Sequence, residues 1–223
     1  MEMKLNFEQE NINCTTSKIV CIGRNYVDHA IELNNPIPSS PIIFMKPPST
    51  LIEYSSSIEI PKDLGAVHYE LEIALLIGEE LDSTSTRDVI ESGIKGVGLA
   101  LDLTLRDVQL KLKNDGHPWE RAKCFPNACP ISSFISAERI SNWEDIKFNL
   151  YKNNNLQQQG NSDKMIFPII KLVQHIAKNF TLNPGDIVLT GTPKGVGPII
   201  KGDCLKAELI LGQPVIETQC TIH

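Results

Sequence analysis

The stretch that decides the fold is residues 68–77, which read His-Tyr-Glu-Leu-Glu-Ile-Ala-Leu-Leu-Ile. It alternates at first and then becomes wholly apolar, as a strand does when it enters a hydrophobic core. Because strand side chains alternate between two faces, Glu70 and Glu72 share one face, and Leu71 and Ile73 lie on the other. We therefore predict a central β-strand that carries two neighbouring carboxylates where a buried surface begins.

Outward from this strand, the chain reads as short β segments interrupted by a few helices. The expected strands are residues 17–23, 42–46, 95–102 and 146–151, with at least three more in the C-terminal part, and the expected helices are residues 26–33, 103–114 and 169–180. A turn at residues 153–155 is expected to open a polar surface loop, residues 153–163. The pattern predicts a strand-rich α+β fold and argues against the regular βαβ alternation of Rossmann and TIM architectures.

The composition bounds the class of protein. The 223 residues, 41% hydrophobic and 22% charged, predict one globular domain, residues 17–223, after a short N-terminal extension, residues 1–16. A formal net charge of −6 without a basic run argues against nucleic acid or an anionic membrane as partner. The first residues resemble neither a secretory signal nor a mitochondrial presequence, and no apolar run approaches the roughly 20 residues that span a bilayer. We therefore expect a cytoplasmic protein.

A third acidic residue turns the paired glutamates into a candidate metal site. Close carboxylates repel each other unless one is protonated or a cation lies between them, and a divalent cation is the common remedy. Residues 96–102 predict a second strand, which ends in Asp102. Three carboxylates would form a facial oxygen triad with open positions, which suits Mg²⁺ or Mn²⁺ and not Zn²⁺. Two alternatives stay open, namely a solvated face for Glu70 and Glu72, and a helix-capping role for Asp102.

A second candidate feature is the pair His29 and Glu32. The two residues are three apart on a predicted helix, so they share a helix face. A carboxylate beside an imidazole fixes its tautomer and raises its basicity, which makes a pair able to activate water. The alternative is a surface pair that contributes little energy.

Five motifs occur in a fixed order along the chain. They are Gly23-Arg-Asn-Tyr26 followed by His29 and Glu32, His68-Tyr-Glu70-Leu-Glu72, Leu99-Ala-Leu-Asp102-Leu-Thr-Leu-Arg106-Asp-Val-Gln109, Ala122-Lys123, and Leu189-Thr-Gly-Thr192-Pro-Lys-Gly-Val-Gly-Pro198. Together they resemble the fumarylacetoacetate hydrolase family, and more narrowly a bacterial member of its acylpyruvase and oxaloacetate-processing branch. The resemblance implies a mixed β-roll of the type found in the family's C-terminal domain, usually as a homodimer.

The resemblance also implies roles for individual residues. It implies Glu70, Glu72 and Asp102 as ligands of Mg²⁺ or Mn²⁺, and His29 with Glu32 as the catalytic pair that activates water. Lys123 would be a third catalytic residue, which stabilises negative charge on the substrate. The implied substrate-binding residues are Arg24, Tyr26, Arg106, Gln109 and Thr192. Lys46 also matches a family position near the site, although a surface lysine at a strand end explains it equally well.

The implied activity concerns small 2-oxo acids, either acylpyruvates or 2-oxo dicarboxylates. The leading interpretation is hydrolysis of a C–C bond in an acylpyruvate through a metal-stabilised enolate. The alternative is keto–enol tautomerisation or decarboxylation of oxaloacetate at the same site, because a distal carboxylate offers water no electrophile. A third and weaker interpretation is a metal- or ligand-binding protein without turnover. It would be favoured had His29, Glu32 or Lys123 been replaced, and all three are present.

Overall fold

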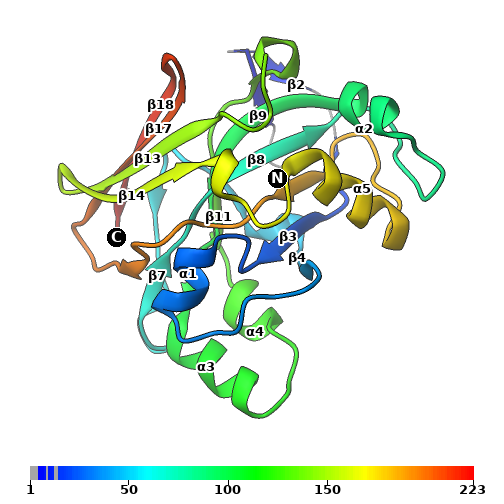
Figure 1. Ribbon diagram of the computed structural model, residues 1–223. Coiled ribbons are helices and arrows are strands. Elements are labelled where there is room, and N and C mark those ends of the chain that lie inside the picture. The colour runs from blue at the N-terminus through cyan, green and yellow to red at the C-terminus, as the bar shows by residue number, and fades with distance from the viewer. Residues whose placement is uncertain (1–4, 9, 13–14) are drawn as a thin grey trace.

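The computed structural model describes residues 5–8, 10–12 and 15–223, and its fold is built on two β-sheets that share one hydrophobic core (Figure 1). The larger sheet has eight strands, in the order β4-β3-β15-β8-β9-β11-β5, with β12 paired to β9. Its strands are β3 (Ile19–Gly23), β4 (Ile42–Lys46), β5 (Leu51–Glu53), β8 (Leu71–Ile77), β9 (Ile94–Leu101), β11 (Cys129–Ile131), β12 (Ile135–Ser136) and β15 (Ile187–Leu189).

The second sheet has five strands, in the order β14-β13-β17-β18-β6. Its strands are β6 (Ser57–Ile58), β13 (Lys147–Lys152), β14 (Asn155–Asn161), β17 (Cys204–Leu211) and β18 (Gln213–Ile222). Two small sheets complete the β structure: β10 (Thr104–Leu105), β7 (Val67–Tyr69) and β16 (Gly197–Pro198) form one, and β1 (Leu5–Phe7) and β2 (Glu10–Ile12) form the other.

Helices lie around the sheets in two groups (Figure 1). The α-helices of the described residues are α1 (Val27–Glu32), α2 (Arg87–Gly93), α3 (Arg106–Asn114), α4 (Glu120–Lys123) and α5 (Ile169–Asn179). Helix α5 packs beside α2 and buries its apolar stripe in the larger core cluster. Helices α1, α3 and α4 gather at the other end of the molecule, and α3 packs against α4.

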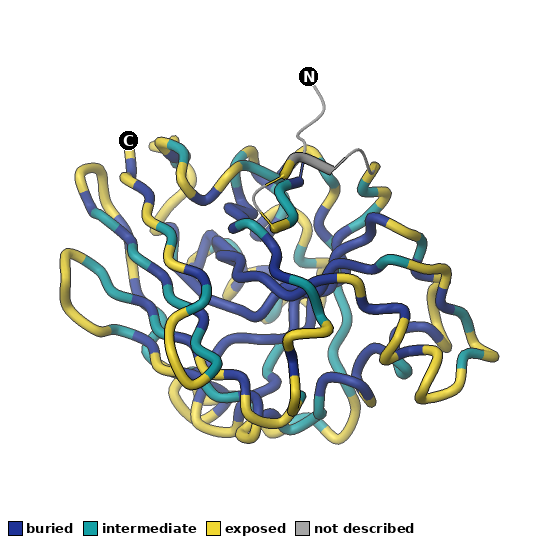
Figure 2. Tube along the Cα trace, turned by 90° about the horizontal axis from the view of Figure 1, so that it is seen from above, coloured by how far each residue is buried: buried dark blue, intermediate teal, exposed yellow. Residues whose placement is uncertain are grey.

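The side chains of β8 divide between two hydrophobic clusters, as a strand with a period of two requires. Ile73 and Leu75 belong to the larger cluster, which both sheets share, whereas Ala74 and Leu76 belong to a smaller cluster on the opposite face of the larger sheet. Figure 2 shows these central segments buried and the connecting loops exposed. The larger sheet therefore curls around the smaller cluster, and the predicted strand-rich α+β fold with a mixed β-roll is confirmed.

Most of the expected elements are present, with shifted ends. The predicted strand at residues 68–77 is divided into β7 and β8, with Glu70 between them. The helix predicted from residue 103 begins only at Arg106, because the two preceding residues form β10 and pair with β7. The long amphipathic helix at residues 169–180 is confirmed as α5, and the expected C-terminal strands are confirmed as β15 to β18.

The expected surface loop at residues 153–163 is wrong, because most of it is strand β14. Asn153 and Asn154 adopt positive φ angles of 52° and 65°, as a tight hairpin turn requires, and β14 pairs with β13 along its length. A Cβ atom at Gly160 would lie 2.2 Å from the Phe148 ring, so only glycine fits there. Polar glutamines hid the strand from the hydrophobic pattern, because sheet pairing outweighs their low strand propensity.

Candidate active site

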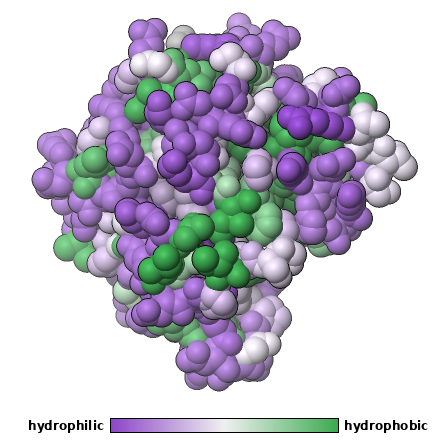
Figure 3. Space-filling view, in the orientation of Figure 1, coloured by the Kyte–Doolittle hydropathy of each residue, from purple (hydrophilic) through white to green (hydrophobic). Residues whose placement is uncertain are grey.

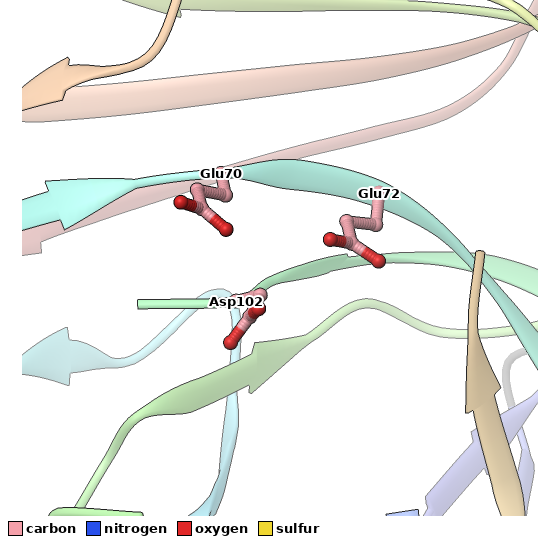
Figure 4. Close-up of side chains that lie close together, drawn as sticks. All are labelled: Glu70, Glu72 and Asp102. Carbon is pink, nitrogen blue, oxygen red and sulfur yellow. The ribbon is translucent and has the colours of Figure 1, made fainter. Parts of the chain in front are cut away.

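Three carboxylates meet where strands β8 and β9 of the larger sheet come together (Figure 4). Glu70 lies between β7 and β8, Glu72 lies in β8, and Asp102 follows the last residue of β9. Strands β8 and β9 pair antiparallel with Leu71 opposite Leu101, which brings the residues that flank this pair together. One ligand oxygen from each acid lies within 4.8 Å of the others, and all three residues are buried.

The carboxylate cluster has the properties of a divalent-cation site. All the donor atoms are carboxylate oxygens, which Mg²⁺ and Mn²⁺ prefer. Asp102 Oδ1 is buried and accepts no hydrogen bond, although it forms an ion pair with Lys46. Lys46 Nζ lies 2.8 Å from this oxygen and donates its hydrogen bonds to the backbone carbonyls of Leu103, Lys123 and Ala128. The residues therefore fit a hard divalent cation held by Glu70, Glu72 and Asp102.

Two buried cations compensate the charge of Glu70. Lys123 donates to Glu70 Oε2 at 2.9 Å and also to Asp102 Oδ2, while Arg106 donates to Glu70 Oε1. Burial alone would raise the pKa of Glu70, but Lys123 and Arg106 outweigh it and lower that pKa. Burial would likewise lower the pKa of Lys123, and the carboxylates of Asp102 and Glu70 raise it instead. Glu70 and Lys123 are thus both charged at neutral pH.

Glu72 differs from Glu70, because it has no cationic partner within ion-pair distance among the described residues. Burial, together with the neighbouring Asp102 and Glu70, raises the pKa of Glu72 well above its usual range. Its Oε2 accepts a hydrogen bond of 2.6 Å from the backbone N–H of Gly191, which holds the carboxylate toward its neighbours. Gly191 has a φ of +99° and lies against Asn25, so a side chain there would be strained.

Helix α1 presents His29 to the site. His29 is 4% exposed, and its Nδ1 lies 3.5 Å from Glu32 Oε2 without forming a hydrogen bond. Burial lowers the pKa of His29, so the imidazole is neutral at pH 7 and can accept a proton. The opposite face of the helix is apolar: Val27 and Ile31 are 40% and 63% exposed, and Figure 3 shows an apolar patch over this part of the molecule.

Helix α1 is joined to the glycine-rich loop, residues 191–198. Glu32 accepts hydrogen bonds of 3.0 and 3.2 Å from the backbone N–H of Gly195, and Lys194 forms an ion pair of 2.7 Å with Asp28. Both contacts are exposed, so each contributes little energy alone. The carboxylate of Glu32 therefore binds the backbone of this loop and also lies beside the imidazole of His29.

The buried amide of Gln158 was missed by sequence reasoning. Its Oε1 accepts a hydrogen bond of 2.9 Å from the backbone N–H of Leu71, and its Nε2 donates to Thr192 Oγ1 at 2.8 Å and to the carbonyl of Pro193 at 2.9 Å. It thus links the strand that carries Glu70 and Glu72 to the loop that carries Thr192. The only sequence signal was a run of three glutamines in a segment without hydrophobic alternation.

One pocket brings most of the predicted site residues together. The predicted residues that line it are Arg24, His29, Glu70, Glu72, Asp102, Arg106, Gln109, Lys123 and Thr192. Arg106 donates to Gln109 Oε1 at 2.6 Å, so these two are held as a pair. Tyr26, Glu32 and Lys46 do not line this pocket. Tyr26 lines a neighbouring hollow with Pro193 and Lys194, and its buried hydroxyl has no hydrogen-bond partner.

Comparisons with known proteins identify the family of the chain. Residues 18–219 match the family model described as the C-terminal region of fumarylacetoacetate (FAA) hydrolase. The chain is 44% identical to oxaloacetate tautomerase YcgM of Escherichia coli (strain K12), covering 89% of this chain and 90% of that protein. It is 40% identical to the mitochondrial oxaloacetate decarboxylase of Dictyostelium discoideum, with 86% and 88% covered.

Solved structures share the whole fold. A protein from Oleispira antarctica is 48% identical and superposes with a TM-score of 0.96, covering 99% of this chain and 100% of that one. Fumarylpyruvate hydrolase from Pseudomonas aeruginosa, solved in complex with Mn²⁺ and pyruvate, is 26% identical with a TM-score of 0.91, covering 99% and 95%. The fold and the sequence comparisons thus point to one family. The chain belongs to the fumarylacetoacetate hydrolase family. Within the described residues, no helix has the length and apolar character needed to cross a membrane.

Proposed function

We propose that this protein is a divalent-metal-dependent oxaloacetate keto–enol tautomerase. The observation that carries the proposal is the buried triad Glu70, Glu72 and Asp102 in the same pocket as the neutral base His29. The choice of reaction is supported by the 44% identity to a protein named oxaloacetate tautomerase. This alternative is therefore better supported than the leading interpretation from sequence, C–C bond hydrolysis.

The pocket residues divide the work of tautomerisation between them. A divalent cation held by Glu70, Glu72 and Asp102 would supply a Lewis acid that stabilises negative charge on the 2-oxo oxygen. His29 removes the proton at C3 while the C2=C3 double bond forms, and the proton is then delivered to the 2-oxo oxygen. Lys123 places a buried ammonium beside the developing negative charge. Atoms and charge balance, because one proton moves from carbon to oxygen.

Three other residues position the substrate. Gln158 donates to the Thr192 hydroxyl oxygen, so the hydroxyl hydrogen is free to donate to the substrate carboxylate. Arg106 and Gln109, held together by their hydrogen bond, orient the substrate from α3. Binding at several points holds the substrate in one orientation toward the catalytic residues before the proton moves. Such orientation supplies much of the rate enhancement.

A substrate panel tests the proposal directly. Purified protein with Mg²⁺ is given enol oxaloacetate and an acylpyruvate, and enol absorbance and pyruvate release are followed separately. We expect rapid loss of the enol signal from oxaloacetate without matching pyruvate release, and loss of activity after exhaustive chelation. Activity that survives complete chelation contradicts the metal-dependent mechanism.

Hydrolysis of an acylpyruvate is the second candidate. It is favoured by the placement of Glu32 close to His29, which suits water activation, and by the fold shared with a fumarylpyruvate hydrolase. The lower identity to that protein, 26%, makes it the weaker candidate. Pyruvate release from the acylpyruvate that outpaces oxaloacetate tautomerisation would reverse this order, and fast carbon dioxide release from oxaloacetate would favour a decarboxylase.

We also propose that the protein works in the cytoplasm as a homodimer, with residues 17–223 as its catalytic domain. The −6 net charge is compatible with a freely diffusing enzyme. Residues 1–16 are proposed as an extension, although Leu5 is buried in the smaller cluster and so packs on the domain. Sedimentation of the purified protein tests the dimer, and a chain that begins at residue 17 tests the extension.

A further inference from the structure

Two cationic side chains in the pocket have no carboxylate partner among the described residues. Arg106 and Lys123 are committed to Glu70, but Arg24 and Lys113 form no ion pair within 4.0 Å in the described part of the chain. Both line the pocket and are half-buried. Half-buried cations that face a cavity without a counter-ion are poorly compensated, so the pocket favours an anion beside them.

A hydrogen bond to Asn35 fixes the position of the Lys113 side chain. Lys113 lies in the last turn of α3, and its Nζ donates a hydrogen bond of 2.6 Å to Asn35 Oδ1, which also lines the pocket. Asn35 follows α1, and its backbone N–H is bonded to the carbonyl of Ala30 at 2.8 Å. The ammonium has three N–H groups and uses one of them on protein among the described residues, so two stay available to a ligand.

Arg24 approaches from a third segment. It follows β3 with a φ of +60°, a left-handed conformation that turns the chain between the strand and α1. Arg24, Arg106 and Lys113 all line the same pocket, so three positive charges face one cavity. Burial lowers the pKa of Lys113, and the positive charges of Arg24 and Arg106 lower it further. Their mutual repulsion is relieved when an anion binds between them.

The charges of the pocket point to a ligand with two carboxylates. The lining contains three acidic residues and four lysine or arginine side chains, and a bound divalent cation would add two more positive charges. One substrate carboxylate and the 2-oxo oxygen satisfy the metal end of the pocket under the proposed function. The remaining positive charge at Arg24 and Lys113 is left for a second carboxylate.

We propose that Lys113, with Asn35 and Arg24, forms a subsite for the distal carboxylate of a 2-oxo dicarboxylate. The subsite rests on the proposed function and deepens it, because it selects a dicarboxylate such as oxaloacetate over an acylpyruvate with an uncharged distal end, such as acetylpyruvate. Lys113 is a specificity-determining residue in this scheme and takes no part in proton transfer. Asn35 orients its ammonium group through their hydrogen bond.

The first test compares two substrates across three variants. In Lys113→Met, the ratio of kcat/KM for oxaloacetate to that for acetylpyruvate is expected to fall about tenfold, the lower end of the range for a hydrogen bond to a charged group. Lys113→Arg keeps the charge and is expected to restore most of the ratio. Lys111→Met, which removes an exposed lysine from the same helix outside the pocket, is expected to keep the wild-type ratio. An unchanged ratio in Lys113→Met overturns the subsite.

The second test separates the subsite from the proposed function. Calorimetry with Mg²⁺ compares pyruvate, which lacks the distal carboxylate, with oxaloacetate. We expect Lys113→Met to weaken oxaloacetate binding about tenfold and to change pyruvate binding less than twofold. If the wild-type protein binds both without tautomerising oxaloacetate, the proposed function fails while the subsite is still tested. Equal weakening of both ligands overturns the subsite.

Discussion

Asp102 donates its backbone N–H to the backbone carbonyl oxygen of Glu70 at 2.8 Å, so two proposed metal ligands are held together by their main chains. The bond continues the pairing of β8 with β9 just beyond the last paired residues of these strands. Side chains that leave a fixed backbone need little reorganisation when they bind a ligand, which is a property of well-formed metal sites. The separation of these two carboxylates is therefore set by sheet pairing.

Replacing Glu72 by Gln should weaken metal binding without lowering the stability of the metal-free protein. The variant loses one anionic ligand, so Mg²⁺ affinity should fall at least about tenfold. Without metal, relief of the repulsion from Asp102 and Glu70 should keep or raise the free energy of unfolding, since Gln can still accept from Gly191. Calorimetry and urea unfolding measure the two effects, with the exposed Glu79→Gln as control. Unchanged Mg²⁺ affinity would show that the paired glutamates are not ligands.

His29→Ala should separate the possible reactions. Loss of a positioned base typically costs ~10²–10⁴-fold, so tautomerisation and any hydrolysis should fall by about that factor. Any decarboxylation should survive better, since it requires no base for water or C3. The three rates are measured on one preparation, with the exposed His117→Ala as control. Undiminished tautomerisation with intact metal binding would remove His29 from the mechanism.

The pH profile should report the buried imidazole of His29. Burial lowers its pKa from the usual value of 6.5, and a base works only when neutral, so kcat/KM should rise with pH through a pKa below 6.5 and then level off. The contribution of His29 to the free energy of unfolding should also rise with pH. The unfolded imidazole binds a proton more readily, so this contribution to stability is present above about pH 6.5 and is lost as pH falls toward the folded pKa. An acidic limb that persists unchanged in His29→Ala would assign it to another group.

Gln158→Leu should impair both stability and substrate binding. The substitution leaves the N–H of Leu71 and the carbonyl of Pro193 without their buried partners, at a cost of about 1–3 kcal/mol each when unsatisfied. It also frees the Thr192 hydroxyl to rotate, so KM should rise more than kcat falls. Urea unfolding and steady-state kinetics measure these changes. The exposed neighbour Gln159→Leu should be close to wild type, and equal effects of both changes would contradict the positioning role.

Helix α1 should become more protected when a ligand binds. The helix has six residues, too few to be stable without packing, and exposed contacts with Gly195 and Lys194 join it to the glycine-rich loop. We expect slower proteolysis around His29 and Glu32 with Mg²⁺ and oxalate than with neither. Equal cleavage rates in the two conditions would contradict ligand-linked closure.

The glutamine-rich segment marks the limit of the sequence pattern. Residues 68–77 and 169–180 were predictable because their apolar spacing matches a strand and a helix, and both signals are local. Gln158 gave no such signal, because a buried amide is stabilised by partners such as Leu71 and Thr192, which lie far away in the sequence. Long-range satisfaction of a polar group leaves no periodicity to detect.

The sequence by itself determined the face that Glu70 and Glu72 share, the strand-rich fold class and the family, since these follow from side-chain alternation and from ordered motifs. Only the tertiary structure decided that Asp102 joins the two glutamates, that Lys46 is a buried donor to backbone carbonyls, and that Lys113 reaches the pocket. Each of these depends on which strands pair and which helices pack at one end of the roll. Strand pairing and helix packing bring together residues that lie far apart along the sequence. Their separation along the sequence does not predict the distance between them in space, so only the folded chain shows these contacts.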